Sequence, residues 1–100
     1  MSINYFPTNL NDHDLASAEL FDNRSLEALI FLIDHGRELE FRYRNQDYFL
    51  SCSGSKKYVS LWCGNVEQGF DSMDALISSA SLQNTPFQNA WSDIELQYLF

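Results

Sequence analysis

The sequence predicts an α+β domain of two layers, with helices packed on one face of an antiparallel sheet of three to four strands. The predicted order of elements is α(α)βββααβ. The main observation is that the hydrophobic period changes from 3.6 residues over residues 25–36 to two residues after Glu38. The 100 residues, 45% of them apolar, suffice for one domain with a core. We therefore expect a single domain over 1–100, with an acidic N-terminal segment over 1–24 and the α+β core over 25–100.

Two helices are expected before the sheet. The first is short and begins at Asn11 or Asp12, where acidic residues suit the positive end of the helix dipole. The second begins at the N-cap Ser25 and ends before Gly36, a residue suited to the left-handed conformation that follows many helices. Its apolar positions follow the i, i+3, i+4, i+7 spacing of a helix face: Leu26, Leu29, Ile30 and Ile33.

Three β-rich runs follow and predict a three-stranded meander: "ELEFRYR", "YFLSCS" and "YVSLWC". A two-residue turn at residues 45–46 sets Tyr43 opposite Tyr48. Pairing Ser53 with Tyr58 sets the second hairpin. Both registers place the same apolar set on one face, and a one-residue slip would break that agreement. The set is Leu39, Phe41, Tyr43, Tyr48, Leu50, Cys52, Val59, Leu61 and Cys63.

The C-terminal third predicts two helices and a final strand. Residues 65–70 are expected to form a turn, after which Asp71 caps a helix over "SMDALISSA". Thr85, Pro86 and Gln88 have the spacing of a capping box and predict a second helix start. The alternating tail "IELQYLF" predicts a strand with these residues on one side: Ile94, Leu96, Tyr98 and Phe100.

The charge is unevenly distributed along the chain. Fourteen acidic residues oppose six basic ones, giving a net charge of −8, and every base lies between Arg24 and Lys57. Nucleic acid should repel such a chain, whereas basic protein surfaces should attract it. The alternative is that the acidity only maintains solubility. The candidate partner contacts in the two base-free ends are Asp12, Asp14, Glu19, Asp22, Glu67, Asp71, Asp74 and Glu95.

No catalytic, metal or cofactor site is predicted. Cys52 and Cys63 fall on adjacent strands four pairs apart, beyond disulfide reach, and are expected to be core thiols. Neither has a Cys or His at metal-ligand spacing, and His13 and His35 belong to no catalytic motif. The longest apolar run, residues 28–33, is too short to span a bilayer, and the N-terminus lacks a signal sequence. A cytoplasmic, non-enzymatic protein is expected.

The solvent face of the predicted sheet is the second candidate surface. It presents two arginines among aromatic residues: Arg42, Arg44, Phe49, Tyr58 and Trp62. One interpretation is a self-contained ladder, in which Arg42 lies opposite Phe49 and Phe49 opposite Trp62. A second is a protein interface, because aromatic residues and Arg are enriched there. A third, base stacking, requires a basic surround that this chain lacks.

Three stretches resemble small acidic proteins of Gram-positive bacteria and their phages: "SLEALIFLIDHGRELEFRYRNQDYFLS", "FDSMDALISSA" and "AWSDIELQYL". The resemblance covers about three quarters of the chain, from Ser25 to Phe100. It contains no diagnostic motif and carries no functional residues. Typical relatives have Asn-Gly where this chain has Asn45-Gln46. Most are uncharacterised, and some are inhibitors, including type II anti-CRISPR proteins and toxin-immunity proteins.

These observations together predict a non-enzymatic inhibitor that binds a basic, nucleic-acid-handling surface of a partner protein. The sharpest form is an anti-CRISPR protein from a phage or mobile element, acting on a CRISPR effector nuclease. One alternative is an immunity protein that neutralises a nuclease toxin. Another is a small host domain that forms a homodimer through its open sheet face. No cofactor, direct nucleic-acid contact or membrane contact is expected.

Overall fold

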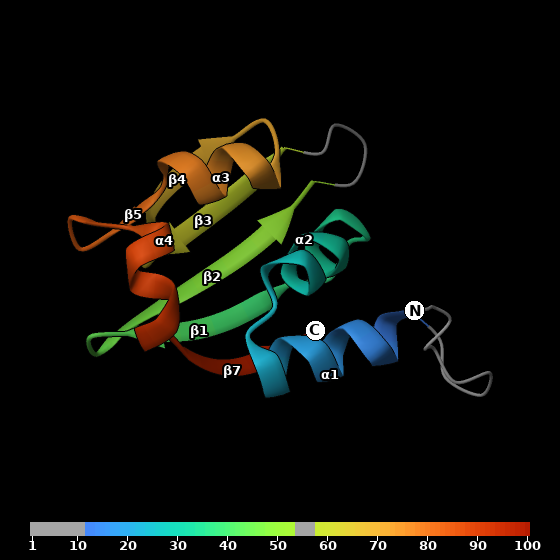
Figure 1. The fold of residues 1–100 in the computed structure, drawn as a ribbon. Helices are drawn as coiled ribbons and strands as arrows, with labels where there is room; N and C mark the ends of the chain where they lie inside the picture. The colour runs from blue at the N-terminus through green and yellow to red at the C-terminus, as the bar shows by residue number, and fades with distance from the viewer. Residues whose placement is uncertain (1–11, 54–57) are drawn as a thin grey trace.

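The computed structural model describes residues 12–53 and 58–100, which form a five-stranded antiparallel sheet with helices on one face (Figure 1). The predicted α+β class is confirmed. The helices are α1 (Asp12–Asn23), α2 (Leu26–Asp34), α3 (Met73–Ser79) and α4 (Phe87–Ala90), followed by the 3-10 turn η1 (Trp91–Asp93). The strands are β1 (Leu39–Tyr43), β2 (Gln46–Cys52), β3 (Val59–Cys63), β4 (Val66–Phe70), β5 (Ser81–Leu82), β6 (Thr85–Pro86) and β7 (Glu95–Leu99).

The main sheet has the strand order β4-β3-β2-β1-β7. The prediction of three to four strands is therefore wrong, because residues 66–70 form strand β4 and not a turn. A two-residue turn joins β3 to β4, with Cys63 opposite Val66. Gly64 has a φ of 61° there, a conformation that glycine adopts without steric cost. A further short hairpin, β5–β6, precedes α4, which also changes the predicted order of elements.

The two hairpins of the meander differ in how well they match the predicted register. In the second, Leu50 pairs with Leu61 as expected. In the first, Tyr43 pairs with Gln46, so the turn residues are Arg44 and Asn45. Their φ values of 50° and 66° fit a primed turn, which needs positive φ at both central positions. The register differs from the expected one by two residues, which keeps every side chain on its predicted face.

The caps of α2 are confirmed. The Ser25 hydroxyl accepts a hydrogen bond from the Ala28 amide at 3.1 Å. Gly36 follows the helix with a φ of 89°, in the left-handed region. As a result α2 has a defined length and direction above the sheet.

The predicted caps of the later helices are wrong. α3 is capped by Ser72, whose hydroxyl accepts from the Ala75 amide at 3.0 Å, and Asp71 lies one residue further out. Thr85 and Pro86 form strand β6 and make no capping box, and α4 begins directly after Pro86 without a side-chain cap. Serine competes well with aspartate as an N-cap, and the β5–β6 pairing uses the residues that resemble a cap.

The last strand contains a bulge that reverses its side-chain alternation. β1 pairs with β7 through Glu40 opposite Tyr98 and Phe41 opposite Leu96, which leaves Gln97 as an extra residue. Leu96 therefore packs against the core, as expected, whereas Tyr98 is 62% exposed and lies on the opposite face. The prediction that Ile94, Leu96, Tyr98 and Phe100 share one side is wrong for Tyr98 and Phe100.

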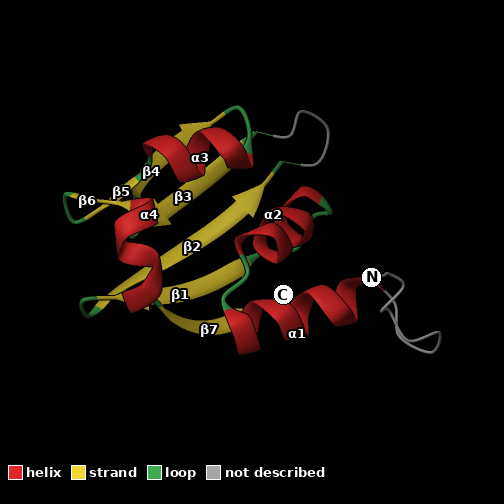
Figure 2. Ribbon diagram, viewed as in Figure 1, coloured by secondary structure: helices red, strands yellow, loops and turns green. Residues whose placement is uncertain are grey.

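The core lies between the helices and the inner face of the sheet (Figure 2). Its largest fully buried side chains come from strands β1, β2 and β3 and from all four helices, with three of them on α2: Leu29, Leu32 and Ile33. The rings of Phe41 on β1 and Tyr48 on β2 stack on each other, with their centroids 5.2 Å apart. This packing fixes the helices on one side and leaves the other face of the sheet uncovered in the described part of the chain.

Stability should fall in alkaline solution because of Tyr48. Burial raises the pKa of its phenol above the ordinary value of 10.0. Because the folded state holds this proton more tightly, its contribution to the free energy of unfolding is fully present below the pKa of the unfolded state. The contribution is lost as the pH rises through the pKa of the folded state. We expect the melting temperature to fall more steeply above about pH 10 in the native chain than in Tyr48→Phe. Thermal unfolding from about pH 8 to about pH 11 measures this. Parallel curves would contradict it.

Candidate protein-binding surfaces

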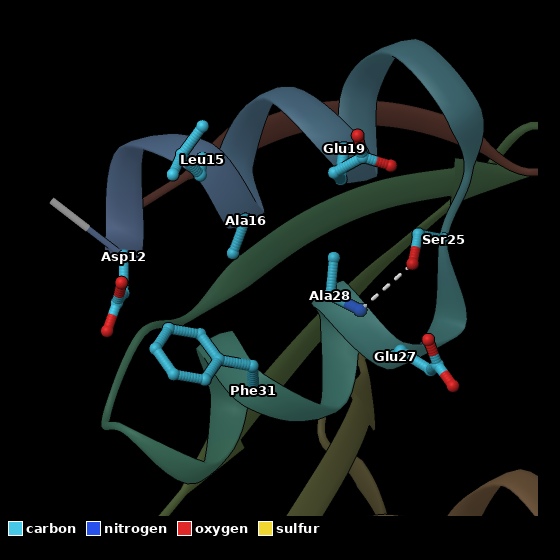
Figure 3. Close-up of a pocket in the computed structure, with 8 residues that line it drawn as sticks. All are labelled: Asp12, Leu15, Ala16, Glu19, Ser25, Glu27, Ala28 and Phe31. Carbon is cyan, nitrogen blue, oxygen red and sulfur yellow. Dashed lines mark hydrogen bonds between the residues drawn. The ribbon is translucent and has the colours of Figure 1, made fainter. Parts of the chain in front are cut away.

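The helical layer contains a groove between α1 and α2, with a volume of about 370 Å³ (Figure 3). Its apolar residues are Leu15, Ala16, Ala28 and Phe31. Figure 3 shows the carboxylates of Asp12, Glu19 and Glu27 around the margin of this apolar centre. None of the described residues that line the groove is basic. It therefore combines an apolar floor with a negative rim, which suits the aliphatic stem and charged head of a Lys or Arg side chain.

A second groove, of about 200 Å³, lies on the other side of α2, next to the start of α3. Its lining residues are Ile30, Asp34, Asp71, Ser72, Met73 and Asp74. Three of these are acidic and none is basic. Glu27 lines the first groove and Asp34 the second, so α2 contributes an acidic residue to each of two depressions in one layer. We call the six lining acids the acidic helical face: Asp12, Glu19, Glu27, Asp34, Asp71 and Asp74.

The arginines nearest this layer are engaged elsewhere. Arg24 donates to the backbone carbonyl of Trp91 at 3.1 Å. Arg37 donates to the carbonyl of Phe100 at 2.6 Å. Arg37 also lies 3.2 Å from the His13 ring on α1. Neither arginine is among the described residues that line the two grooves.

The eight acidic residues proposed from the sequence divide between surfaces. Asp12, Glu19, Asp71 and Asp74 line the two grooves. Asp14 and Asp22 are exposed on α1 outside the groove linings, and Glu67 and Glu95 lie on strands of the open face. The sequence reasoning missed Glu27 and Asp34, because they fall in the segment where basic residues balance the acidic ones. The two residues are seven positions apart and so lie on one exposed stripe of α2, which was the available signal.

The arginines of the predicted open face do not form the expected ladder. Arg42 lies opposite Asp47 and not Phe49, and its Nε donates to the Asp47 carboxylate at 2.8 Å. This hydrogen bond raises the pKa of Arg42 above its ordinary value. Arg44 lies in the β1–β2 turn, with its guanidinium carbon 5.1 Å from the Tyr43 ring centroid. Each arginine therefore already contacts a neighbouring side chain of the same hairpin, Asp47 for Arg42 and Tyr43 for Arg44.

The aromatic residues of the open face are placed as predicted. Phe49 and Trp62 are half-buried and lie opposite each other on β2 and β3. Tyr58 is exposed, and its ring lies over Gly69, where a Cβ atom would overlap it. The bulge in β7 adds Tyr98 to this face, and Phe100 contacts Phe49 with ring centroids 6.4 Å apart.

The described residues contain no group of three or more His, Cys, Asp or Glu side chains placed to hold a metal ion. Cys52 and Cys63, both in the described part of the chain, form no disulfide with each other and pack against the core. Within residues 12–53 and 58–100, no helix has the length and apolar character needed to cross a membrane.

No family model, curated protein or solved structure matches this chain. The fold and its surfaces define a two-layer α+β protein with an acidic helical side and an aromatic sheet side. The resemblance to small acidic proteins of Gram-positive bacteria and their phages stays an expectation from the sequence.

Proposed function

We propose that the protein is a non-enzymatic inhibitor that uses the acidic helical face to bind a basic, nucleic-acid-handling surface of a partner protein. In its sharpest form it is an anti-CRISPR protein that occupies the nucleic-acid channel of a CRISPR effector nuclease. The observation that carries the proposal is the pair of grooves beside α2, whose described lining residues include six carboxylates and no base.

The grooves give the charge a geometry that solubility alone does not require. Each combines carboxylates with apolar surface: Phe31 with Glu27 in one, Ile30 with Asp34 in the other. A Lys or Arg side chain could bury its aliphatic stem on the apolar residue and direct its cation to the carboxylate. A channel that normally holds phosphates presents many such side chains, so several would be engaged together.

The net charge of −8 supports the same class of partner. Summed negative charge accelerates encounter with a basic surface and makes association sensitive to salt. It also disfavours direct binding to nucleic acid, whose phosphates would be repelled. The inhibitor would therefore compete with nucleic acid for its partner and would not bind the nucleic acid itself.

Capture from a bacterial lysate with elution by a salt gradient tests the proposal. We expect a basic nucleic-acid enzyme to elute, and to elute at lower salt from Glu27→Gln/Asp34→Asn, which changes one carboxylate in each groove. Association with the purified partner should slow by about threefold to tenfold in this variant.

The matched control is Glu38→Gln/Asp93→Asn, which removes two carboxylates that line neither groove. It should elute close to the native chain. Equal effects of the two variants would show that only net charge matters, and an eluate without a basic nucleic-acid enzyme would contradict the proposal. Capture of a nuclease toxin would instead favour the immunity-protein alternative.

A further inference from the structure

Five side chains form one row across the open face of the main sheet, one from each strand. Trp62 lies opposite Glu67 on one side and opposite Phe49 on the other. Glu40 on β1 lies opposite Phe49 on β2 and, on its other side, opposite Tyr98 on β7. The row therefore reads Glu67, Trp62, Phe49, Glu40, Tyr98, so that the two aromatic rings Trp62 and Phe49 lie between two carboxylates. We call it the transverse row.

The transverse row is complete only because of the bulge at Gln97. Without the extra residue, Tyr98 would share the inward face of Leu96. With it, the Tyr98 ring stands beside Glu40 and is 62% exposed. The adjacent positions on β2 and β3 are Ser51 and Ser60, and the Ser60 hydroxyl donates to the Glu67 carboxylate, which orients this acid on the open face.

The electrostatics of this face favour a cation. Glu40, Glu67 and Glu95 join the aromatic rings, and Arg42 is already hydrogen-bonded to Asp47. Carboxylates and the negative faces of aromatic rings both attract ammonium and guanidinium groups. An occupant of this face should therefore carry positive charge.

A second copy of the chain fits this face poorly. Five strands about 4.8 Å apart and about five residues long cover roughly 400 Å², about half of the roughly 800 Å² that each partner buries in a stable complex. Two such faces would also bring like charges together, since each carries more carboxylates than arginines. The limited area suits a short segment better than a folded domain.

We infer that the transverse row binds a short, extended, arginine- or lysine-bearing segment of a partner protein. Glu67 and Glu40 stand three strands apart, at about 14 Å, a distance that an extended chain covers in about four residues. Two cations at that spacing would reach the two carboxylates, with Trp62 and Phe49 beneath the residues between them. This surface is distinct from the acidic helical face, and the inference stands whichever partner that face binds.

A labelled peptide of about eight residues, with two arginines about four positions apart, tests this by fluorescence polarisation against the full chain. Glu40→Gln and Tyr98→Ala should each weaken binding by about threefold to fivefold. Both side chains lie near the sheet edge, so the fold should survive, and a melting curve verifies this. Two matched controls should bind like the native chain. Asp93→Asn removes one carboxylate outside the row, and Phe21→Ala removes an exposed ring on α1.

Three outcomes would overturn the inference. If Glu40→Gln and Asp93→Asn bound the peptide with equal affinity, the peptide would be attracted only by the net negative charge of the chain and not by the transverse row. Weakening by Glu27→Gln/Asp34→Asn but not by Glu40→Gln would assign the peptide to the helical grooves, which would support the proposed function and not this surface. A native chain that is dimeric in solution, and becomes monomeric in Trp62→Ala, would make the second copy the occupant.

Discussion

Replacing Phe41 with alanine should destabilise the protein by about 3–5 kcal/mol, a large share of the roughly 5–15 kcal/mol that holds a domain folded. Phe41 is fully buried on β1, the strand that pairs with both β2 and β7. Its ring stacks on Tyr48, so the substitution leaves a cavity and removes an aromatic contact. Urea unfolding followed by circular dichroism measures the change.

Phe49→Ala is the matched control, because the same side chain is removed from the other face of the neighbouring strand. Phe49 is half-buried on the open face and contacts Trp62 and Phe100. We expect this substitution to cost about 1 kcal/mol, in the range of exposed cross-strand pairs. A loss as large as that of Phe41→Ala would mean that the two faces of the sheet are assigned incorrectly.

The alternation of residues along the first three strands was enough to predict these faces, even though one turn was misplaced. The turn occupies Arg44 and Asn45, not Asn45 and Gln46, yet the side chains of Phe41 and Tyr48 still point inward. A shift of two residues preserves the faces, because the side-chain period of a strand is also two. Inward and outward residues are thus more predictable from sequence than their exact partners.

Strand β4 and the bulge in β7 could not be predicted in the same way. Glu67 and Gly69 are poor strand formers, and β4 is an edge strand held by its pairing with β3. At Gln97, alternation in the sequence indicates a regular strand, and only the pairing with β1 reveals the extra residue. Both features depend on tertiary contacts that leave little local signal.

The candidate binding surface was predicted only in part. Four of the acidic residues that the base-free ends supplied line the grooves: Asp12, Glu19, Asp71 and Asp74. Their arrangement on either side of α2 depends on how α1 and α3 pack, which the sequence does not encode locally. The grooves, and the part played by Glu27 and Asp34, therefore emerge only from the fold.

Replacing Trp91 with alanine should cost about 3–5 kcal/mol, and replacing it with phenylalanine about 1–3 kcal/mol. The Trp91 indole is 7% exposed and stacks on Phe87, with ring centroids 5.6 Å apart. Its Nε1 donates to the carbonyl of Arg24 at 2.8 Å, while the Arg24 guanidinium donates to the carbonyl of Trp91. Phenylalanine keeps most of the ring but leaves the partly buried Arg24 carbonyl without this donor.

This reciprocal pair holds the junction of α1 and α2, and therefore the groove between them. Arg24 has a φ of 55°, which non-glycine residues adopt only when their surroundings enforce it, and the two hydrogen bonds to Trp91 supply that constraint. Relative to the native chain, we expect Trp91→Phe to accelerate amide exchange in α1 more than in β2. The reason is that α1 loses the hydrogen bond that holds its C-terminal end, while the sheet remains paired. Trp62→Phe, which keeps an aromatic ring on the open face, should leave exchange in α1 unchanged. If Trp91→Phe destabilised the protein as much as Trp91→Ala, the hydrogen bond and not the packing of the ring would be the main contribution of Trp91.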